Sequence, residues 1–318
     1  MKILLNKYKK LIYILILPYL AISFILVYPA KKAIITPGGL TEVEDFIEIA
    51  NTNEISNIYT VYVYDFYPAT IFQNFITKYN ERFDNYIPSI YDTETTISER
   101  ILMGKISKNH SITNSLIMAY NEASLFKENI KINYNYLGAE IYFRSKHLSL
   151  LNIGDIITHI DNMSLTYDDF IEYFKNNNEF TLTINNNKTV KYVKNNTDVF
   201  TFFPKYEIIS ATPSYNIINT NTSGPSGGFM QALSIYLRLM NIDLDLKIAG
   251  TGTIGINGDI GKIGGIKQKI YTAIDNNVDY FFMPLANLEN LDLNKYGINI
   301  IAVSTFKEAV EKINELYY

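Results

Sequence analysis

Segments typical of β-strands alternate with segments typical of α-helices along the last third of the chain. From residue 200 onward the order is a strand at YEIIS, a helix over 227–240, a strand at LKIAGTGTI, a helix at KQKIYTAIDNN, strands at YFFMP and INIIAV, and a helix from about Thr305 to Leu316. Such alternation is the pattern of an α/β layer. We therefore expect an α/β (α+β) domain over residues 198–318.

The composition excludes several classes of protein. The chain has 318 residues, 47% of them hydrophobic and 19% charged, which suffices for two or three folded units. It has no cysteine, so a cysteine nucleophile, a thiolate metal site and a disulfide framework are excluded. The net charge of −4 gives no general attraction to nucleic acid. His110, His147 and His159 lack the spacing of a zinc site, and we expect neither a metal nor a cofactor.

The N-terminus carries an uncharged, largely apolar run over residues 11–30, after a segment with four lysines. A helix of that length spans a bilayer core, and more lysines precede it than follow it. We predict that residues 1–30 form a cytoplasmic tip and an uncleaved transmembrane helix, in a single-pass protein of the cell membrane whose catalytic part is extracellular. A cleaved signal peptide is the alternative, although no clear cleavage site follows the run.

Residues 31–124 mix strand and helix signals. ITPGGL at 35–40 indicates a turn, IYTVYVYDFY at 58–67 alternates like a strand, and residues 71–83 have a helical period. No pattern in this region indicates chemistry.

Residues 125–197 have the pattern of a small β-rich module with one helix at YDDFIEYFKNN. Its segment LLNIGDIITHIDNMSLTYDDFIEYFKNN resembles a PDZ domain of the bacterial periplasmic type. The resemblance implies a module that binds an extended peptide by adding it to a sheet edge beside a helix. A β-rich structural spacer is the alternative. His159 lies in the strand IITHID, and we expect a strand residue there rather than a ligand.

The glycine-rich segment 249–269 carries two partial nucleotide-binding motifs. Its AGTGTIG fits the glycine spacing of a dinucleotide fingerprint, but a turn follows where a helix is required. Its GK pair resembles a phosphate loop, but Ile263 stands where Ser or Thr would hold magnesium. A hairpin that turns at Asn257-Gly258 fits the segment better. The chain contains no ATP-binding motif.

A hydroxyl stands at the corner between a glycine-rich turn and a helix. In NTSGPSGGFMQALSIYLRLM, Ser226 lies between Pro225 and Gly227, and apolar residues recur at helical spacing from Phe229. Serine is among the best residues for a helix N-cap. The same position suits a nucleophile, because unpaired N–H groups at a helix start face a ligand. The turn alone leaves both interpretations open.

A serine nucleophile needs a neighbouring base. All three histidines precede Ser226 and lie outside the α/β part, so a histidine would have to reach across domains. Lysine is the other common base, provided that burial lowers its pKa. GGIKQKIYTAI offers Lys267 and Lys269, and Lys269 can point along the buried edge of a helix whose apolar face includes Ile266 and Ile270.

SGPSGG, AGTGTI and GKIGGIKQK, in that order, resemble the proteolytic domain of the Lon family of serine proteases. With an anchor and a PDZ-like module in place of the ATPase, the chain is similar to the membrane-anchored, PDZ-containing Lon-like proteases of bacteria. The resemblance implies that Ser226 is the nucleophile and Lys269 the base. It implies that Thr251 holds the lysine and that Pro225 and Gly227 support the site. Lys267 is then expected to be solvated.

The resemblance also implies an organisation of the chain. Residues 1–30 would be the anchor, 31–124 an anchor-proximal region that contributes strands to the protease domain, 125–197 the inserted PDZ-like module, and 198–318 the Lon-type protease domain. Phe229 is bulkier than its counterpart in many relatives, and we expect it to narrow the nearby cleft.

We therefore predict an ATP-independent, membrane-anchored serine endopeptidase. It would cleave extracellular or membrane-associated peptides or flexible polypeptides and bind no nucleic acid, with a homo-oligomer as a further option. The rival function is a catalytically inert peptide-binding scaffold. That rival is disfavoured because a buried lysine is costly when nothing uses it.

Overall fold

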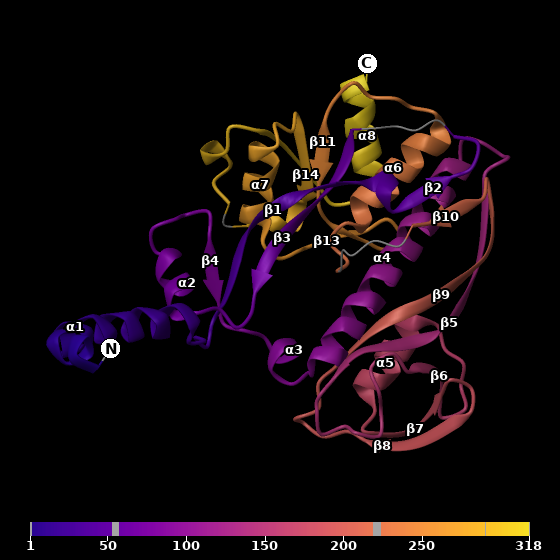
Figure 1. The fold of residues 1–318 in the computed structure, drawn as a ribbon. Helices are drawn as coiled ribbons and strands as arrows, with labels where there is room; N and C mark the ends of the chain where they lie inside the picture. Colours follow the sequence, from indigo (N-terminus) through magenta and orange to yellow (C-terminus); the bar gives the residue numbers. More distant parts are fainter. Residues whose placement is uncertain (1, 53–56, 219–223, 290, 318) are drawn as a thin grey trace.

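The computed structural model describes residues 2–52, 57–218, 224–289 and 291–317. They form a six-stranded mixed sheet with helices on both faces and a five-stranded sheet with one helix (Figure 1). A long helix runs between these two parts, and the N-terminal helix projects away from both (Figure 1).

The six-stranded sheet has the order β15-β14-β11-β3-β1-β4. The strands are β1 Ala33–Glu42, β3 Ile58–Phe66, β4 Asp84–Tyr86, β11 Ile248–Gly250, β14 Tyr280–Pro284 and β15 Asn299–Val303. As the alternating pattern predicts, β11, β14 and β15 pair in parallel. The other neighbour of β11 is β3, also parallel, with Ile248 opposite Ile58. Strands from the first hundred residues thus complete the sheet of the α/β part.

The turn predicted at residues 35–40 is wrong. These residues lie inside β1, which pairs antiparallel with β3 and shifts register between Pro37 and Gly39. A Cβ on Gly38 would lie 2.3 Å from the carbonyl oxygen of Tyr62. The glycines therefore allow two strands to approach closely and do not reverse the chain. The strand predicted at 58–67 is confirmed as β3, whereas helix α2, Ile71–Ile76, is shorter than the period over 71–83 predicted.

Alternate residues of the sheet face two different helix layers. Phe281 of β14 packs with Ile270 and Ala273 of helix α7, Ile266–Asp275. The next residue, Phe282, packs in the larger cluster with helix α6, Gly228–Met240, and helix α8, Phe306–Tyr317. This is the side-chain period of a strand covered on both faces.

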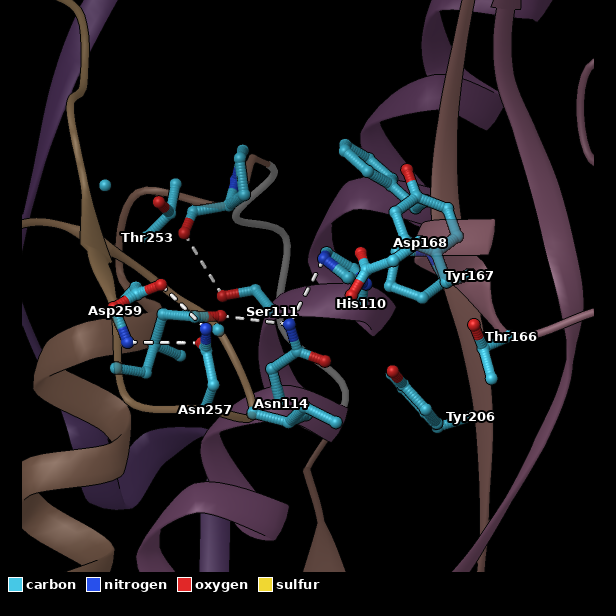
Figure 2. A pocket seen from close by; sticks show the side chains of 17 residues that line it. His110, Ser111, Asn114, Thr166, Tyr167, Asp168, Tyr206, Thr253, Asn257 and Asp259 are labelled. Carbon is cyan, nitrogen blue, oxygen red and sulfur yellow. Dashed lines mark hydrogen bonds between the residues drawn. The ribbon is translucent and has the colours of Figure 1, made fainter. Parts of the chain in front are cut away.

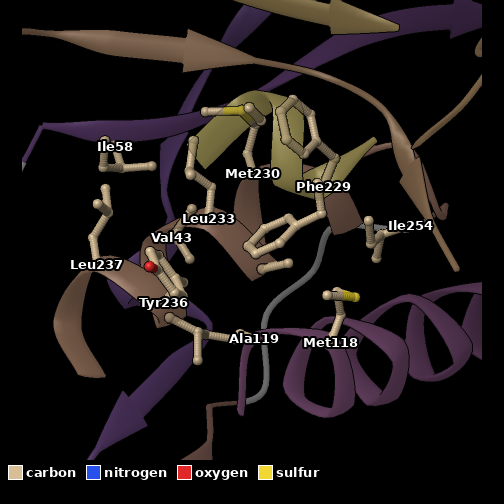
Figure 3. Close-up of a cluster of buried hydrophobic side chains, with 14 of the residues drawn as sticks. Val43, Ile58, Met118, Ala119, Phe229, Met230, Leu233, Tyr236, Leu237 and Ile254 are labelled. Atoms are coloured by element: carbon tan, nitrogen blue, oxygen red, sulfur yellow. The ribbon is translucent and has the colours of Figure 1, made fainter. Parts of the chain in front are cut away.

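Helix α6 lies at the centre of the larger cluster. Figure 3 shows its side chains from Phe229 to Leu237 packed between Ile58 of β3 and Met118 of helix α4, Ile97–Ser124. Phe229 is fully buried there. The expectation that its ring narrows the cleft is therefore wrong.

The five-stranded sheet has the order β8-β7-β6-β5-β9 and carries helix α5, Tyr167–Asn176. Its strands are β5 Lys131–Arg144, β6 Ile156–Ile160, β7 Glu179–Ile184, β8 Lys188–Val193 and β9 Phe200–Thr212. Phe170 of α5 and Leu182 of β7 lie in its own hydrophobic cluster. The chain leaves this sheet through β9, which pairs with β5 and forms one edge of the sheet as described.

Small elements complete the chain. They are η1 Val43–Asp45, β2 Ile47–Ile49, α3 Ile90–Thr93, β10 Tyr215–Ile217, β12 Thr253–Ile254, β13 Ile260–Gly261, η2 Leu285–Asn287 and η3 Leu293–Lys295. β12 and β13 pair antiparallel around a turn in which Gly258 has φ 90°, so the hairpin predicted at Asn257-Gly258 is confirmed. β2 and β10 form a separate pair.

Helix α4 joins the two sheets. Its first half packs on the five-stranded part, where Met103 and Ile106 share a cluster with Phe143 and Glu99 pairs with Arg144 at 2.8 Å. Its second half packs on α6 (Figure 1). One rigid helix therefore contacts both sheets.

The predicted transmembrane helix is wrong, and with it the single-pass membrane localisation. Among the described residues, no helix is both long enough and apolar enough to cross a membrane. Helix α1, Lys2–Val27, begins among the lysines and ends before the uncharged run does. From Leu11 its uncharged part is about 17 residues, or roughly 26 Å, against a hydrocarbon core of about 30 Å. The run's last residue, Ala30, is instead bound to the carbonyl of Ala69 at 2.7 Å.

Candidate active site

Ser226 lies in the turn directly before α6. The N-cap of α6 is Gly227, and no described side chain caps the helix, so the N-cap interpretation of Ser226 is wrong. Two backbone bonds fix the turn on the segment after β11: Gly252 N–H donates to the carbonyl of Ser226 at 2.7 Å, and Phe229 N–H donates to that of Gly252 at 3.0 Å. The hydroxyl is half-buried and free of the capping role.

Lys269 reaches this hydroxyl from α7. Its Nζ lies 2.7 Å from Ser226 Oγ and 2.8 Å from Thr251 Oγ1. The side chain is 2% exposed, and it forms no ion pair with any residue that the structure describes. Burial lowers the pKa of the Lys269 amine to about 7. Near neutral pH a large share of the amine is therefore uncharged and able to accept a proton.

Thr251 connects the serine and the lysine. It is fully buried directly after β11, where its N–H donates to the carbonyl of Phe282 at 3.0 Å. Its hydroxyl accepts the bond from Lys269 and donates to the carbonyl of Ser226 at 2.9 Å. Three residues far apart in the sequence thus form one hydrogen-bonded group.

The turn before α6 also depends on close contacts that limit side-chain size. A Cβ on Gly227 would lie 3.2 Å from Thr60 Cγ2 of β3, and one on Gly228 would lie 2.6 Å from Ser111 Oγ of α4. Ser111 Oγ donates to the carbonyl of Pro225 at 3.2 Å. Pro225 and Gly227 therefore support the turn through contacts with α4 and β3.

Residues of α4 that touch this turn were not identified from the sequence. Besides Ser111, Ser115 Oγ donates to the carbonyl of Gly228 at 2.8 Å, and Asn114 Nδ2 donates to that of Ile254 at 2.9 Å. A signal was available, because Ser107, Ser111 and Ser115 recur at every fourth position and so share one helix face.

Lys267 is paired, which contradicts the expectation that it is solvated. Its Nζ binds Asp84 Oδ1 of β4, and Gln268 Nε2 donates to Asp84 Oδ2 at 2.8 Å. Gln268 is 1% exposed. Asp84 thereby ties the start of α7, the helix that carries Lys269, to the edge of the six-stranded sheet.

The three histidines lie elsewhere. His159 is a residue of β6, as predicted, and His147 binds Asp198 within the five-stranded part. His110 lies on α4, where its ring stacks on Phe203. In the described part of the chain, none of them hydrogen-bonds to Ser226.

A cavity of about 600 Å³ opens beside Pro225, the residue before the serine. Figure 2 shows the hairpin residues Thr253 and Asp259 on one side of it and His110 of α4 on the other, with Asp168 and Tyr206 beyond. The cavity therefore lies where the turn, the hairpin β12–β13, helix α4 and the five-stranded part meet.

Comparison with known proteins finds a family match for the C-terminal part of the chain. Residues 185–315 match the family model described as the Lon protease (S16) C-terminal proteolytic domain. Residues 185–315 are thus similar to a Lon-type proteolytic domain, and Ser226, Thr251 and Lys269 all lie inside the matched range. The match leaves out β3 and α4, both of which contact the turn that holds Ser226.

Individual relatives are Lon proteases of bacteria and archaea. Lon protease 2 of Bacillus subtilis is 36% identical over 90 residues, which cover 28% of this chain and 16% of the relative. Lon protease of Borrelia duttonii is 33% identical over 96 residues, 29% of this chain and 12% of the relative. The archaeal Lon protease of Archaeoglobus fulgidus is 30% identical over 95 residues, 29% of this chain and 15% of the relative. The chain thus matches less than a fifth of the length of these relatives.

Proposed function

We propose that this chain is a serine endopeptidase in which Ser226 is the nucleophile and Lys269 the general base. The observation that carries the proposal is the 2.7 Å hydrogen bond between Lys269 Nζ and Ser226 Oγ in a buried site. The relatives, which are named proteases, support it. A hydroxyl bound to a buried amine of lowered pKa is the arrangement that activates a serine without histidine.

The reaction begins with neutral Lys269. Its amine takes the proton of Ser226 as Oγ attacks the scissile carbonyl carbon, which gives a tetrahedral oxyanion and a lysine ammonium. Backbone N–H groups around Ser226, at the start of α6, stabilise the oxyanion. The ammonium then donates its proton to the leaving amine, and the C–N bond breaks to leave an acyl-enzyme. Water, deprotonated by Lys269, hydrolyses the ester and restores the serine.

Thr251 orients the base throughout this cycle. Its hydroxyl accepts from Lys269 Nζ and donates to the Ser226 carbonyl, so it aims the amine at Oγ in both protonation states. No carboxylate pairs with Lys269 among the described residues, and burial alone keeps its pKa low. A carboxylate partner would stabilise the ammonium and raise the pKa, so that less of the amine would be neutral near pH 7.

Substrates are peptides or flexible polypeptides, and hydrolysis does not require ATP in this proposal. The chain carries no ATP-binding motif, so nothing in it unfolds a compact substrate. An extended segment is the form that can reach a half-buried serine.

We further propose that the part over residues 125–197, together with the first half of β9, binds extended peptides. Three features support it. β9 is an edge strand, α5 lies beside it, and Tyr167 Oη of α5 donates to the carbonyl of Phe202 of β9 at 2.7 Å. A second cavity of about 550 Å³ follows α5 past Ile171. An edge strand beside a helix is the geometry for strand addition.

The dyad is tested with purified protein, a quenched-fluorescence unstructured peptide and a serine-reactive fluorophosphonate. Ser226→Ala and Lys269→Ala should each lower kcat at least about a thousandfold, and the double variant should be no worse than either. Lys269→Arg should be as inactive as Lys269→Ala, because arginine stays protonated. Lys267→Ala is the matched control on the same helix and should retain activity. Activity that survives Lys269→Arg and vanishes in a His110 or His159 variant would show that a histidine, and not Lys269, is the general base.

The peptide-binding part is tested by comparing a long and a short substrate. Ile171→Asp, which places a charge in the cavity along α5, should slow hydrolysis of unfolded casein more than that of a ten-residue peptide. Glu179→Gln on β7, away from β9 in the same sheet, is the control. Equal loss on both substrates would make this part a structural support only.

A further inference from the structure

The cavity beside Pro225 has acidic and aromatic walls. Asp168, at the start of α5, and Asp259, in the hairpin β12–β13, are the carboxylates among its lining residues, and both are exposed. Within the described ranges, no lysine or arginine lines it. Nearby cations are engaged elsewhere: Lys205 Nζ binds Glu140 at 3.1 Å, and Lys262 Nζ lies 3.5 Å from Glu289.

His110 adds no positive charge to this cavity. Its ring is held between the Asn114 amide, with Nε2 at 3.2 Å from Nδ2, and the carbonyl of Pro204. Burial lowers the pKa of His110 to about 4, so the imidazole is neutral at physiological pH. A cation entering the cavity would meet no like charge from this ring.

A buried acceptor without a partner lies in the same wall. Asn114 is 3% exposed, and its Nδ2 is satisfied by Ile254 and His110, but its Oδ1 has no hydrogen-bond partner among the described residues. Figure 2 shows this oxygen directed away from the hairpin, towards the side of the cavity where Tyr206 stands. Buried acceptors are nearly always satisfied by protein, water or ligand, so this covered oxygen beside the cavity is a position where the described protein supplies no donor.

Aromatic side chains complete the wall opposite the hairpin. Tyr167 and Tyr206 line the cavity together with Phe203, on which His110 stacks at 4.5 Å. Ring faces attract cations, lysine and arginine side chains among them. Carboxylates, an unpaired carbonyl oxygen and aromatic rings together suit a cationic group with several N–H donors and an aliphatic stem.

We propose that this cavity binds the side chain of a lysine or arginine residue of the substrate, close to the scissile bond. The inference rests on the proposed function, since it takes Ser226 as the nucleophile. Asp168 comes from the five-stranded part and Asp259 from the proteolytic domain. The bound cation therefore links the two parts, and a substrate chain that runs from the edge of β9 to Ser226 passes this cavity with its basic side chain inside.

Binding is tested in the Ser226→Ala chain, which does not consume the ligand. Fluorescein-labelled ten-residue peptides carry lysine, arginine, glutamine or glutamate at one scanned position, and affinity is read by fluorescence anisotropy. At one position, lysine and arginine peptides should bind about tenfold more tightly than the glutamine peptide. Asp168→Asn and Asp259→Asn should each lower this preference about threefold, and the double variant should abolish it. Raising the salt to about 0.5 M should weaken it too.

Glu179→Gln is the matched control, because it removes one carboxylate from the same five-stranded part outside the cavity. It should leave the preference unchanged. Equal affinity for all four peptides, or a preference that persists in the double aspartate variant, would overturn the inference. Thermal unfolding of each variant checks that these exposed substitutions leave the fold intact.

Hydrolysis of the same peptides by the unsubstituted chain separates this inference from the proposed function. Cleavage of all the peptides at similar rates would support the peptidase activity and contradict the proposed binding of a basic side chain. Tighter binding of basic peptides, without any cleavage or fluorophosphonate labelling, would support the proposed binding site and contradict the peptidase activity.

Discussion

The hydroxyl of Thr251 accepts a hydrogen bond from the amine of Lys269 at 2.8 Å. This bond fixes the direction of the amine, and a misplacement of about 1 Å can cost two orders of magnitude in rate. Thr251→Val, which keeps the shape and removes the hydroxyl, should lower kcat about 10- to 100-fold with little change in KM. Thr251→Ser is the control and should keep most of the activity. Steady-state kinetics measure kcat and KM for each variant. An unchanged kcat in the valine variant would show that Thr251 has no positioning role.

The pH dependence of the reaction should follow the Lys269 amine. Because burial lowers its pKa to about 7 and the neutral form is the base, kcat/KM should rise with pH and reach half its maximum near pH 7. The profile is measured with a peptide that has no titratable group between pH 5 and 9. A rise that begins only near pH 10 would mean that the free enzyme holds this lysine at its ordinary pKa.

Lys269 should also destabilise the fold at low pH. Its pKa is about 7 when folded and near 10.5 when unfolded, so the unfolded chain binds more protons between these values and stability rises with pH across that range. Lys269→Met should therefore raise the free energy of unfolding by the order of 4 kcal/mol at pH 6, falling to about 2 kcal/mol at pH 9. Urea unfolding at both pH values measures this.

The control for that comparison is Lys267→Met on the same helix. Lys267 is partly exposed and paired with Asp84, so its replacement should not stabilise the fold. A Lys269→Met variant less stable than the unsubstituted chain at pH 6 would contradict the assignment of a costly buried amine.

Gly228 should tolerate no methyl group while Ser111 is present. A Cβ there would lie 2.6 Å from Ser111 Oγ, so Gly228→Ala should cost about 1–3 kcal/mol despite the higher helix propensity of alanine. In the Ser111→Ala background the clash is with a smaller side chain, and the cost should fall by at least half. A double-mutant cycle by urea unfolding measures the coupling. Additive effects of the two substitutions would show that they do not touch.

The site could be predicted from the sequence because its residues lie in short local motifs. Ser226, Thr251 and Lys269 each stand in a glycine-containing turn or at a helix start, and local patterns determine such positions. The alternation of strands and helices after residue 200 was likewise readable, since each strand is apolar and each helix has a clear period.

Helix α4 could not be found by the same rule. Its buried face carries Ser107, Ser111, Asn114 and Ser115, so an apolar period does not mark the side that faces the nucleophile turn. Ser111, Asn114 and Ser115 bind carbonyls of residues more than a hundred positions away, which no local pattern contains. The turn expected at residues 35–40 was wrong for a related reason. Its glycines allow the close approach of the neighbouring strand β3, which lies outside the local sequence.

The parallel pairing of Ile58 with Ile248 has a consequence for how the chain folds. β3 emerges during synthesis about 190 residues before its partner β11, and the five-stranded part lies between them. That part can therefore fold first, whereas the sheet that contains β1 and β3 cannot be completed until β11 has been synthesised. A fragment cut to the matched residues 185–315 would leave one edge of β11 open, and expression of that fragment alone should give an insoluble chain.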